Sequence, residues 1–114
     1  MITIDNLKEY GANVDEGMAR CMGNEALYLR LVTTIPAEAN FDKLASSIEA
    51  RDLDAAFDAA HALKGVTGNL ALTPLYQAIF DITELLRART DTDYSELIKS
   101  ITELRDQLAA LCAG

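Results

Sequence analysis

The sequence has few or none of several residue types, and these absences limit what the protein can be. Tryptophan is missing, aromatic residues make up 6% of the chain, and the 114 residues include two prolines, two cysteines and one histidine. One histidine and two cysteines far apart in sequence match no metal-ligand spacing, so no metal site is predicted. A disulfide between Cys21 and Cys112 is possible, but nothing in the sequence implies it.

Positive charge is also scarce. Ten Lys and Arg residues against eighteen Asp and Glu residues give a formal net charge of -8. This charge repels phosphate backbones and anionic lipid, which argues against nucleic acid and membrane surfaces as partners. No apolar run approaches the roughly 20 residues needed to span a bilayer, and no basic-then-apolar leader opens the chain. We therefore expect a cytoplasmic protein.

Hydrophobic residues, by contrast, make up half of the chain. A chain of this length can bury a core without disulfides or metals, so we expect one domain over residues 1–114, present as a monomer. Apolar residues recur at steps of three and four, while the alternating pattern of strands is absent. This periodicity predicts an all-α protein.

Capping and turn residues divide the chain into helices. The expected helices cover about residues 13–22, 24–48, 52–69, 73–86 and 93–111. Pro36 either kinks the second helix or splits it in two, and its first half is expected to bury Leu27, Leu31 and Ile35. Asn13 followed by Glu16 resembles a capping box. Asp52 is an expected N-cap, and so is Thr73, directly before Pro74. The four long helices predict an antiparallel four-helix bundle, with the short N-terminal helix covering one end.

The helix at 52–69 departs from a simple amphipathic pattern. On a helical wheel, one side is the core side and carries Ala56, Ala60, Leu63, Thr67 and Leu70. The opposite side carries Asp54, Asp58, His61, Gly65 and Gly68. The only histidine is therefore predicted to face solvent. A lone surface histidine is often incidental, so its neighbours must decide.

Two of those neighbours are glycines, and each costs roughly 1 kcal/mol relative to Ala inside a helix. Gly65 and Gly68 lie one and two turns beyond His61. The missing side chains would leave a smooth strip of backbone beside the imidazole, where another protein's active site could approach. Helix packing is the alternative, but packing would place the glycines on the inner side.

The chemistry of this face suits phosphoryl transfer. A neutral imidazole has a nitrogen lone pair that can attack phosphorus, and Lys64, one turn from His61, offers positive charge for phosphoryl oxygens. Lys64 could also be a simple solvated charge. An enzyme using His61 as a general base is disfavoured, because no orienting carboxylate and oxyanion partner accompany it, and it would require a concave pocket.

The motif His61-Ala62-Leu63-Lys64-Gly65, followed by Gly68-Asn69-Leu70, resembles the signature of histidine-containing phosphotransfer (HPt) domains. The likeness extends over about residues 13 to 90. It departs from the family pattern at Ala71, where the family most often has Gly, which bears on the local turn geometry.

The resemblance implies that His61 accepts a phosphoryl group from the aspartyl phosphate of a response-regulator receiver domain and passes it to another. A hybrid sensor histidine kinase is an implied partner. Lys64 would hold the phosphoryl oxygens, and Gly65, Gly68 and Asn69 would meet the receiver. No cofactor is implied, since magnesium is expected only in the receiver, and the protein would be a phosphocarrier without kinase activity. The alternative is a helical adaptor that binds a receiver or partner helix without phosphotransfer.

Three residues near His61 have open roles. Phe57 could dock a partner or pack at the edge of the bundle. Asp58 could orient the imidazole or be one more solvated charge. Gln77, on the next helix, could reach the phosphoryl group through water, although the helix phase makes this weak.

Overall fold

The computed structural model describes residues 1–113, and its regular structure consists entirely of helices. In chain order these are α1 (Ile4–Tyr10), α2 (Val14–Arg20), α3 (Glu25–Thr34), the 3-10 turn η1 (Ile35–Ala37), α4 (Asn40–Glu49), α5 (Leu53–Asn69), α6 (Thr73–Arg87) and α7 (Ser95–Ala113). No strand occurs within residues 1–113, so the all-α prediction is confirmed. None of the helices in this range is long and apolar enough to cross a membrane.

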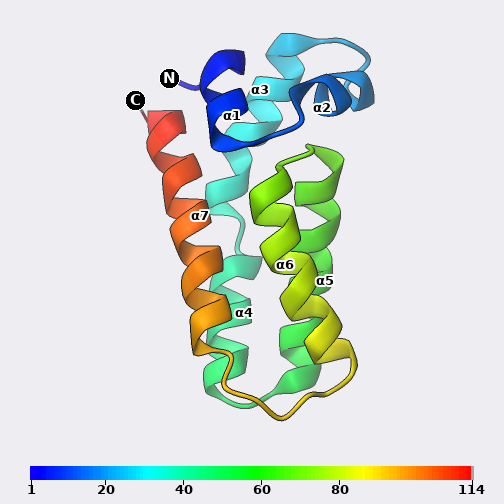
Figure 1. Cartoon of the computed structure of the whole chain (residues 1–114), viewed down its shortest axis with the longest axis vertical. Coiled ribbons are helices and arrows are strands. Elements are labelled where there is room, and N and C mark those ends of the chain that lie inside the picture. Colours follow the sequence, from blue (N-terminus) through cyan, green and yellow to red (C-terminus); the bar gives the residue numbers. More distant parts are fainter. Residues whose placement is uncertain (114) are drawn as a thin grey trace.

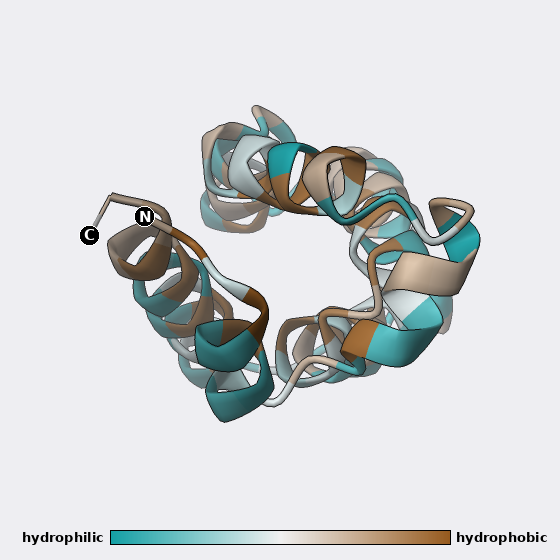
Figure 2. Cartoon of the chain, turned by 90° about the horizontal axis from the view of Figure 1, so that it is seen from above, coloured by the Kyte–Doolittle hydropathy of each residue, from teal (hydrophilic) through white to brown (hydrophobic). Residues whose placement is uncertain are grey.

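The helices α4 to α7 run along the long axis of the molecule, and α1 to α3 gather at one end (Figure 1). The extents along the principal axes are 41, 25 and 20 Å. Helix α5 packs between α4 and α6, while α7 packs against α6 and also meets α1 and η1. Seen from above, the helices surround a common centre (Figure 2). The core includes the fully buried side chains Leu63, Leu75, Ile79, Ile82 and Leu108.

The first seven-residue helix, α1, is absent from the sequence-based prediction. Thr3 caps it, because its side chain accepts from the Asn6 backbone N–H at 3.1 Å while the Asn6 side chain accepts from the Thr3 N–H at 2.9 Å. Gly11 ends the helix with φ 107°, a left-handed conformation that suits glycine. The following helix, α2, begins after Asn13, whose side chain accepts from the Glu16 N–H as predicted.

The buried face of α3 differs from the prediction. Leu31 is 38% exposed, whereas Tyr28 and Val32 are fully buried and Ile35 is 4% exposed. The reason is that Tyr28 has a partner inside the core: its hydroxyl donates to the Leu70 carbonyl at 2.9 Å. A polar group can be buried when its hydrogen bond is made.

The connections were predicted with mixed success. At Pro36 the chain forms η1 and then α4, so the long second helix is split rather than kinked. The N-cap prediction for Thr73 is wrong by one residue, since Leu72 is the N-cap and the Thr73 hydroxyl instead donates to the Ala71 carbonyl at 3.3 Å. Cys21 is buried and Cys112 partly buried, and both are free.

Candidate functional site

Helix α5 positions the candidate site, and its local structure follows from its sequence. Asp52 caps the helix, because its carboxylate accepts from the Ala55 N–H at 3.1 Å. The predicted core side is confirmed: Ala56, Ala60 and Leu63 are fully buried. Thr67 is buried as well, and its hydroxyl donates to the Leu63 carbonyl at 2.8 Å. With this side fixed against α4 and α6, the opposite side of α5 must face solvent.

His61 and Gly65 lie on that outer side, as predicted. Both are exposed, and so are Asp54 and Asp58. A Cβ atom built on Gly65 would meet no other atom within 4 Å. The backbone one turn beyond the imidazole is therefore open to an approaching molecule.

Gly68 has a different environment from the one predicted. It is half-buried, and a Cβ atom there would lie 3.0 Å from Cε1 and 3.2 Å from Cδ1 of Tyr76. The missing side chain thus makes room for a ring on α6. Gly68 also lines a hollow on the surface together with Lys64 and Gly65, so its expected contact with a partner stays a prediction.

Phe57 lies one turn before His61 and forms an aromatic stack with it. The two ring centroids are 5.7 Å apart and the ring planes differ by 19°. The guanidinium carbon of Arg87, the last residue of α6, lies 5.1 Å from the centroid of the Phe57 ring. Arg87 also donates through Nε to Glu84 at 3.2 Å. Phe57 is half-buried, and its ring contacts the imidazole itself.

Lys64 is half-buried beside the exposed stripe. Its Nζ atom lies 5.7 Å from the centroid of the Phe80 ring, a cation–π contact. Within residues 1–113 no carboxylate lies within ion-pair distance of Lys64, although five other such pairs are formed. Its positive charge is therefore not neutralised by a neighbouring acid.

Three other predicted residues lie on or near this face of the molecule. Asn69 is exposed, and its side-chain Oδ1 accepts from the Arg20 guanidinium of α2 at 3.3 Å. Gln77 donates to Asp81 at 3.0 Å. Among the described residues neither Gln77 nor Asp58 makes a hydrogen bond to His61, and the roles suggested for them stay predictions.

His61 lies on a ridge between two shallow hollows. One hollow, of about 470 Å³, is lined by Lys64, Gly65 and Asn69 together with Arg20 and Tyr76. The other, of about 400 Å³, is lined on α5 by Asp54, Phe57 and Asp58. His61 lines neither of them. A convex position of this kind suits contact with a partner's active site, whereas a general-base enzyme would enclose its substrate.

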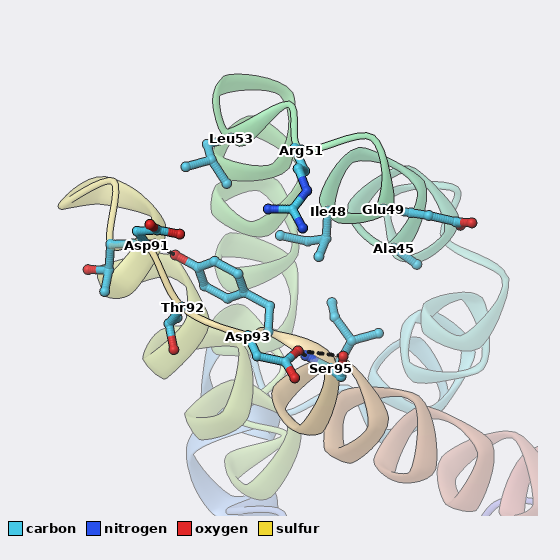
Figure 3. Close-up of a pocket in the computed structure, with 12 residues that line it drawn as sticks. Ala45, Ile48, Glu49, Arg51, Leu53, Asp91, Thr92, Asp93 and Ser95 are labelled. Atoms are coloured by element: carbon cyan, nitrogen blue, oxygen red, sulfur yellow. Dashed lines mark hydrogen bonds between the residues drawn. The ribbon is translucent and has the colours of Figure 1, made fainter.

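A larger pocket, of about 980 Å³, is drawn with its lining residues in Figure 3. It is lined by residues of the α4–α5 turn and the α6–α7 loop, among them Arg51, Asp91 and Asp93. Asp93 accepts from the Ser95 hydroxyl at 2.5 Å and from its N–H at 2.9 Å, and these hydrogen bonds lower the pKa of Asp93. None of the predicted site residues lines this pocket.

The fold is thus a set of packed helices with an exposed histidine on the outer side of α5, outside the neighbouring hollows. A family model described as Hpt domain matches residues 36–114, so the chain belongs to the Hpt domain family. No curated protein and no solved structure matches the chain. Hpt domains carry phosphoryl groups on histidine in two-component signalling, are phosphocarrier modules rather than kinases, and interact with receiver domains and kinases.

Several supporting residues were missed from the sequence. Arg87, Phe80 and Tyr76 come from α6, and their contacts depend on how α6 packs beside α5. The spacing of residues along α5 cannot identify these α6 side chains, because periodicity describes one helix at a time. Arg20 lies 49 residues from Asn69, and no pattern links the two.

Proposed function

We propose that this protein is a phosphorelay intermediate in which His61 accepts a phosphoryl group from one receiver domain and passes it to another. The observation that supports this most is the position of the only histidine of the chain, exposed on a convex helix face beside a bare glycine. A hybrid sensor histidine kinase is the proposed source of the phosphoryl group, carried on its receiver. We further propose that the protein acts as a monomer and a single domain, with α4 to α7 as its antiparallel four-helix bundle.

The transfer requires only the imidazole of this chain as the reacting group. The unprotonated ring nitrogen of His61 attacks phosphorus of the receiver's aspartyl phosphate. A P–N bond forms, the P–O bond to the aspartyl group breaks, and the aspartate leaves with that electron pair as a carboxylate. In the second transfer, a carboxylate oxygen of another receiver attacks phosphorus, the P–N bond breaks, and its electron pair returns to the ring.

The neighbours of His61 would assist by charge and by access. Phosphoryl transfer depends chiefly on positioning and on compensation of oxygen charge. Lys64 carries a charge that no nearby carboxylate neutralises, so it can turn from Phe80 toward the phosphoryl oxygens. Gly65 leaves room for the receiver's backbone. Asn69, on the same hollow, would contact the receiver at its edge.

The direct test incubates the protein with phosphorylated receiver domains from the same genome and follows label on His61. The label should be stable in alkali and lost in acid, and His61→Gln should abolish it, because no second imidazole can accept phosphorus. Circular dichroism of His61→Gln should show an intact helical fold. Label that survives acid, or that persists in His61→Gln, contradicts the proposal. Receiver binding by an unlabelled wild-type protein would instead favour the adaptor.

A further inference from the structure

The contact between Phe57 and His61 carries an inference beyond the proposed phosphotransfer. Residues four apart on a helix are neighbours, so the Phe57 ring can reach the imidazole without distorting α5. The rings are stacked, with 5.7 Å between centroids and 19° between planes. An exposed side chain on a helix ridge would otherwise move among its staggered rotamers.

The position of Phe57 is itself supported from α6. The Arg87 guanidinium lies 5.1 Å from the centroid of the Phe57 ring, and Glu84 holds Arg87 through a 3.2 Å hydrogen bond. A line of contacts thus runs from Glu84 through Arg87 and Phe57 to His61. It links the reacting side chain to a second helix, although the imidazole makes no hydrogen bond within residues 1–113.

We propose that Phe57 is a positioning residue for His61: its ring holds the imidazole in the orientation from which a ring nitrogen meets phosphorus in line, and Arg87 holds the Phe57 ring. In-line transfer within a docked complex is sensitive to small displacements of the nucleophile. A ring that fixes one face of the imidazole leaves its nitrogen-bearing edge free. This role differs from partner docking and from packing at the edge of the bundle.

The proposal rests on His61 being the phosphoacceptor, so its test needs a measurement that does not depend on transfer. Because the chain has one histidine, its imidazole proton resonances can be assigned without ambiguity. The ring current of Phe57 should displace them in the wild-type protein. Phe57→Leu should return them toward their values in an unstructured peptide, whereas Phe57→Tyr should keep them displaced. Unchanged resonances in Phe57→Leu would overturn the stack in solution, whatever the outcome of the transfer assay.

Transfer kinetics then separate positioning from docking. We expect Phe57→Leu to lower the transfer rate at saturating phosphorylated receiver about 2- to 10-fold, from the usual strength of an aromatic pair. The receiver concentration that gives half the maximal rate should stay unchanged, and Phe57→Tyr should restore the rate. If Phe57→Leu raised only the half-saturating receiver concentration and left the maximal rate unchanged, Phe57 would be a docking residue and the proposal would be overturned. A wild-type protein that accepts no label would refute the proposed function, while the resonances would still report the stack.

A variant of Arg87 tests the second contact without removing the aromatic ring. Arg87→Gln should move the His61 resonances and the saturating rate in the same direction as Phe57→Leu, by less. Its matched control is Arg105→Gln, since Arg105 of α7 makes the same type of contact at 5.5 Å with Phe41 of α4, and neither residue belongs to α5 or α6. Arg105→Gln should leave the His61 resonances in place. If Arg87→Gln also leaves the His61 resonances in place, the proposal that Arg87 holds the Phe57 ring is wrong.

Discussion

Adding a side chain at Gly65 should separate the stability of α5 from the access of a partner to His61. Glycine inside a helix costs roughly 1 kcal/mol relative to Ala, mainly because the unfolded chain has more freedom. A Cβ atom at this position meets nothing within 4 Å, so no steric cost opposes the gain. Gly65→Ala should therefore raise the free energy of unfolding by about 0.5 to 1 kcal/mol. In a domain of this size that corresponds to a rise in Tm of about 2 to 4 °C.

Two other helical glycines provide graded controls. At Gly68 a new Cβ would lie 3.0 Å from the Tyr76 ring, so the gain in helix propensity should be largely cancelled. At Gly17 it would lie 2.4 Å from Cε1 of Tyr28, a buried ring tied to the core, and Gly17→Ala should cost about 1 to 3 kcal/mol. Thermal unfolding followed by circular dichroism should give the highest Tm for Gly65→Ala, a lower one for Gly68→Ala and the lowest for Gly17→Ala.

The functional half of the prediction uses a larger side chain. Gly65→Leu should keep or raise Tm, because Leu is a good helix former at an exposed position. Phosphotransfer from a receiver should fall by about 100-fold, since a displacement near 1 Å already costs that much in a positioned reaction. Unfolding of Gly65→Leu, or an unchanged transfer rate, would refute the reasoning that this face of α5 is kept bare for a partner.

Three further predictions concern the surroundings of this face. Lys64→Ala should leave Tm unchanged within error and slow transfer about tenfold, as expected from losing one charged contact to the phosphoryl group. If the variant and the wild-type protein transferred at the same rate, Lys64 would be only a solvated surface charge. Tyr28→Phe removes the donor to the Leu70 carbonyl and should cost about 1 to 2 kcal/mol in urea unfolding at pH 7. Burial raises the pKa of Tyr28 from 10.0 to about 12. The contribution of this group to the free energy of unfolding is therefore complete below pH 10 and is lost as the pH rises through about 12. Tyr28→Phe should remove this loss. Ala71 has φ 53°, a left-handed conformation that costs residues other than glycine about 1 to 2 kcal/mol. Ala71→Gly should therefore keep or raise Tm despite the lost methyl group, and a fall in Tm would contradict this.

The sequence was sufficient to predict α5 and its two faces, because Asp52 gives a capping signal and the apolar residues keep one period over four turns. It was not sufficient for α3, where Tyr28 and Val32 have the same spacing as Leu27 and Leu31. The choice between these two faces depends on the Leu70 carbonyl, which lies 42 residues away and accepts the Tyr28 hydroxyl. The periodicity of one helix contains no information about a hydrogen-bond partner so distant in the sequence.

The same distinction applies to the site. The outward positions of His61 and Gly65 follow from the phase of one helix, and the structure confirms them. The environments of Gly68 and Phe57 depend on Tyr76 and Arg87 of α6, whose contacts arise only when two helices pack. The side chains of a single helix could thus be predicted, whereas the contacts between helices could not.

The hydrogen bond from Tyr28 to Leu70 has a consequence for protein engineering. The family match begins at residue 36, yet residues before it complete the end of α5: Tyr28 donates to Leu70, the Asn13 N–H donates to the Ala71 carbonyl at 2.9 Å, and Arg20 donates to Asn69. A chimera that exchanges only residues 36–114 would leave these acceptors without their donors at the end of α5. The transplantable unit therefore has to include residues 13–35 with α2 and α3, and, if the proposed docking face is right, a change of partner specificity is better made on the exposed face of α5 than by exchanging the matched segment.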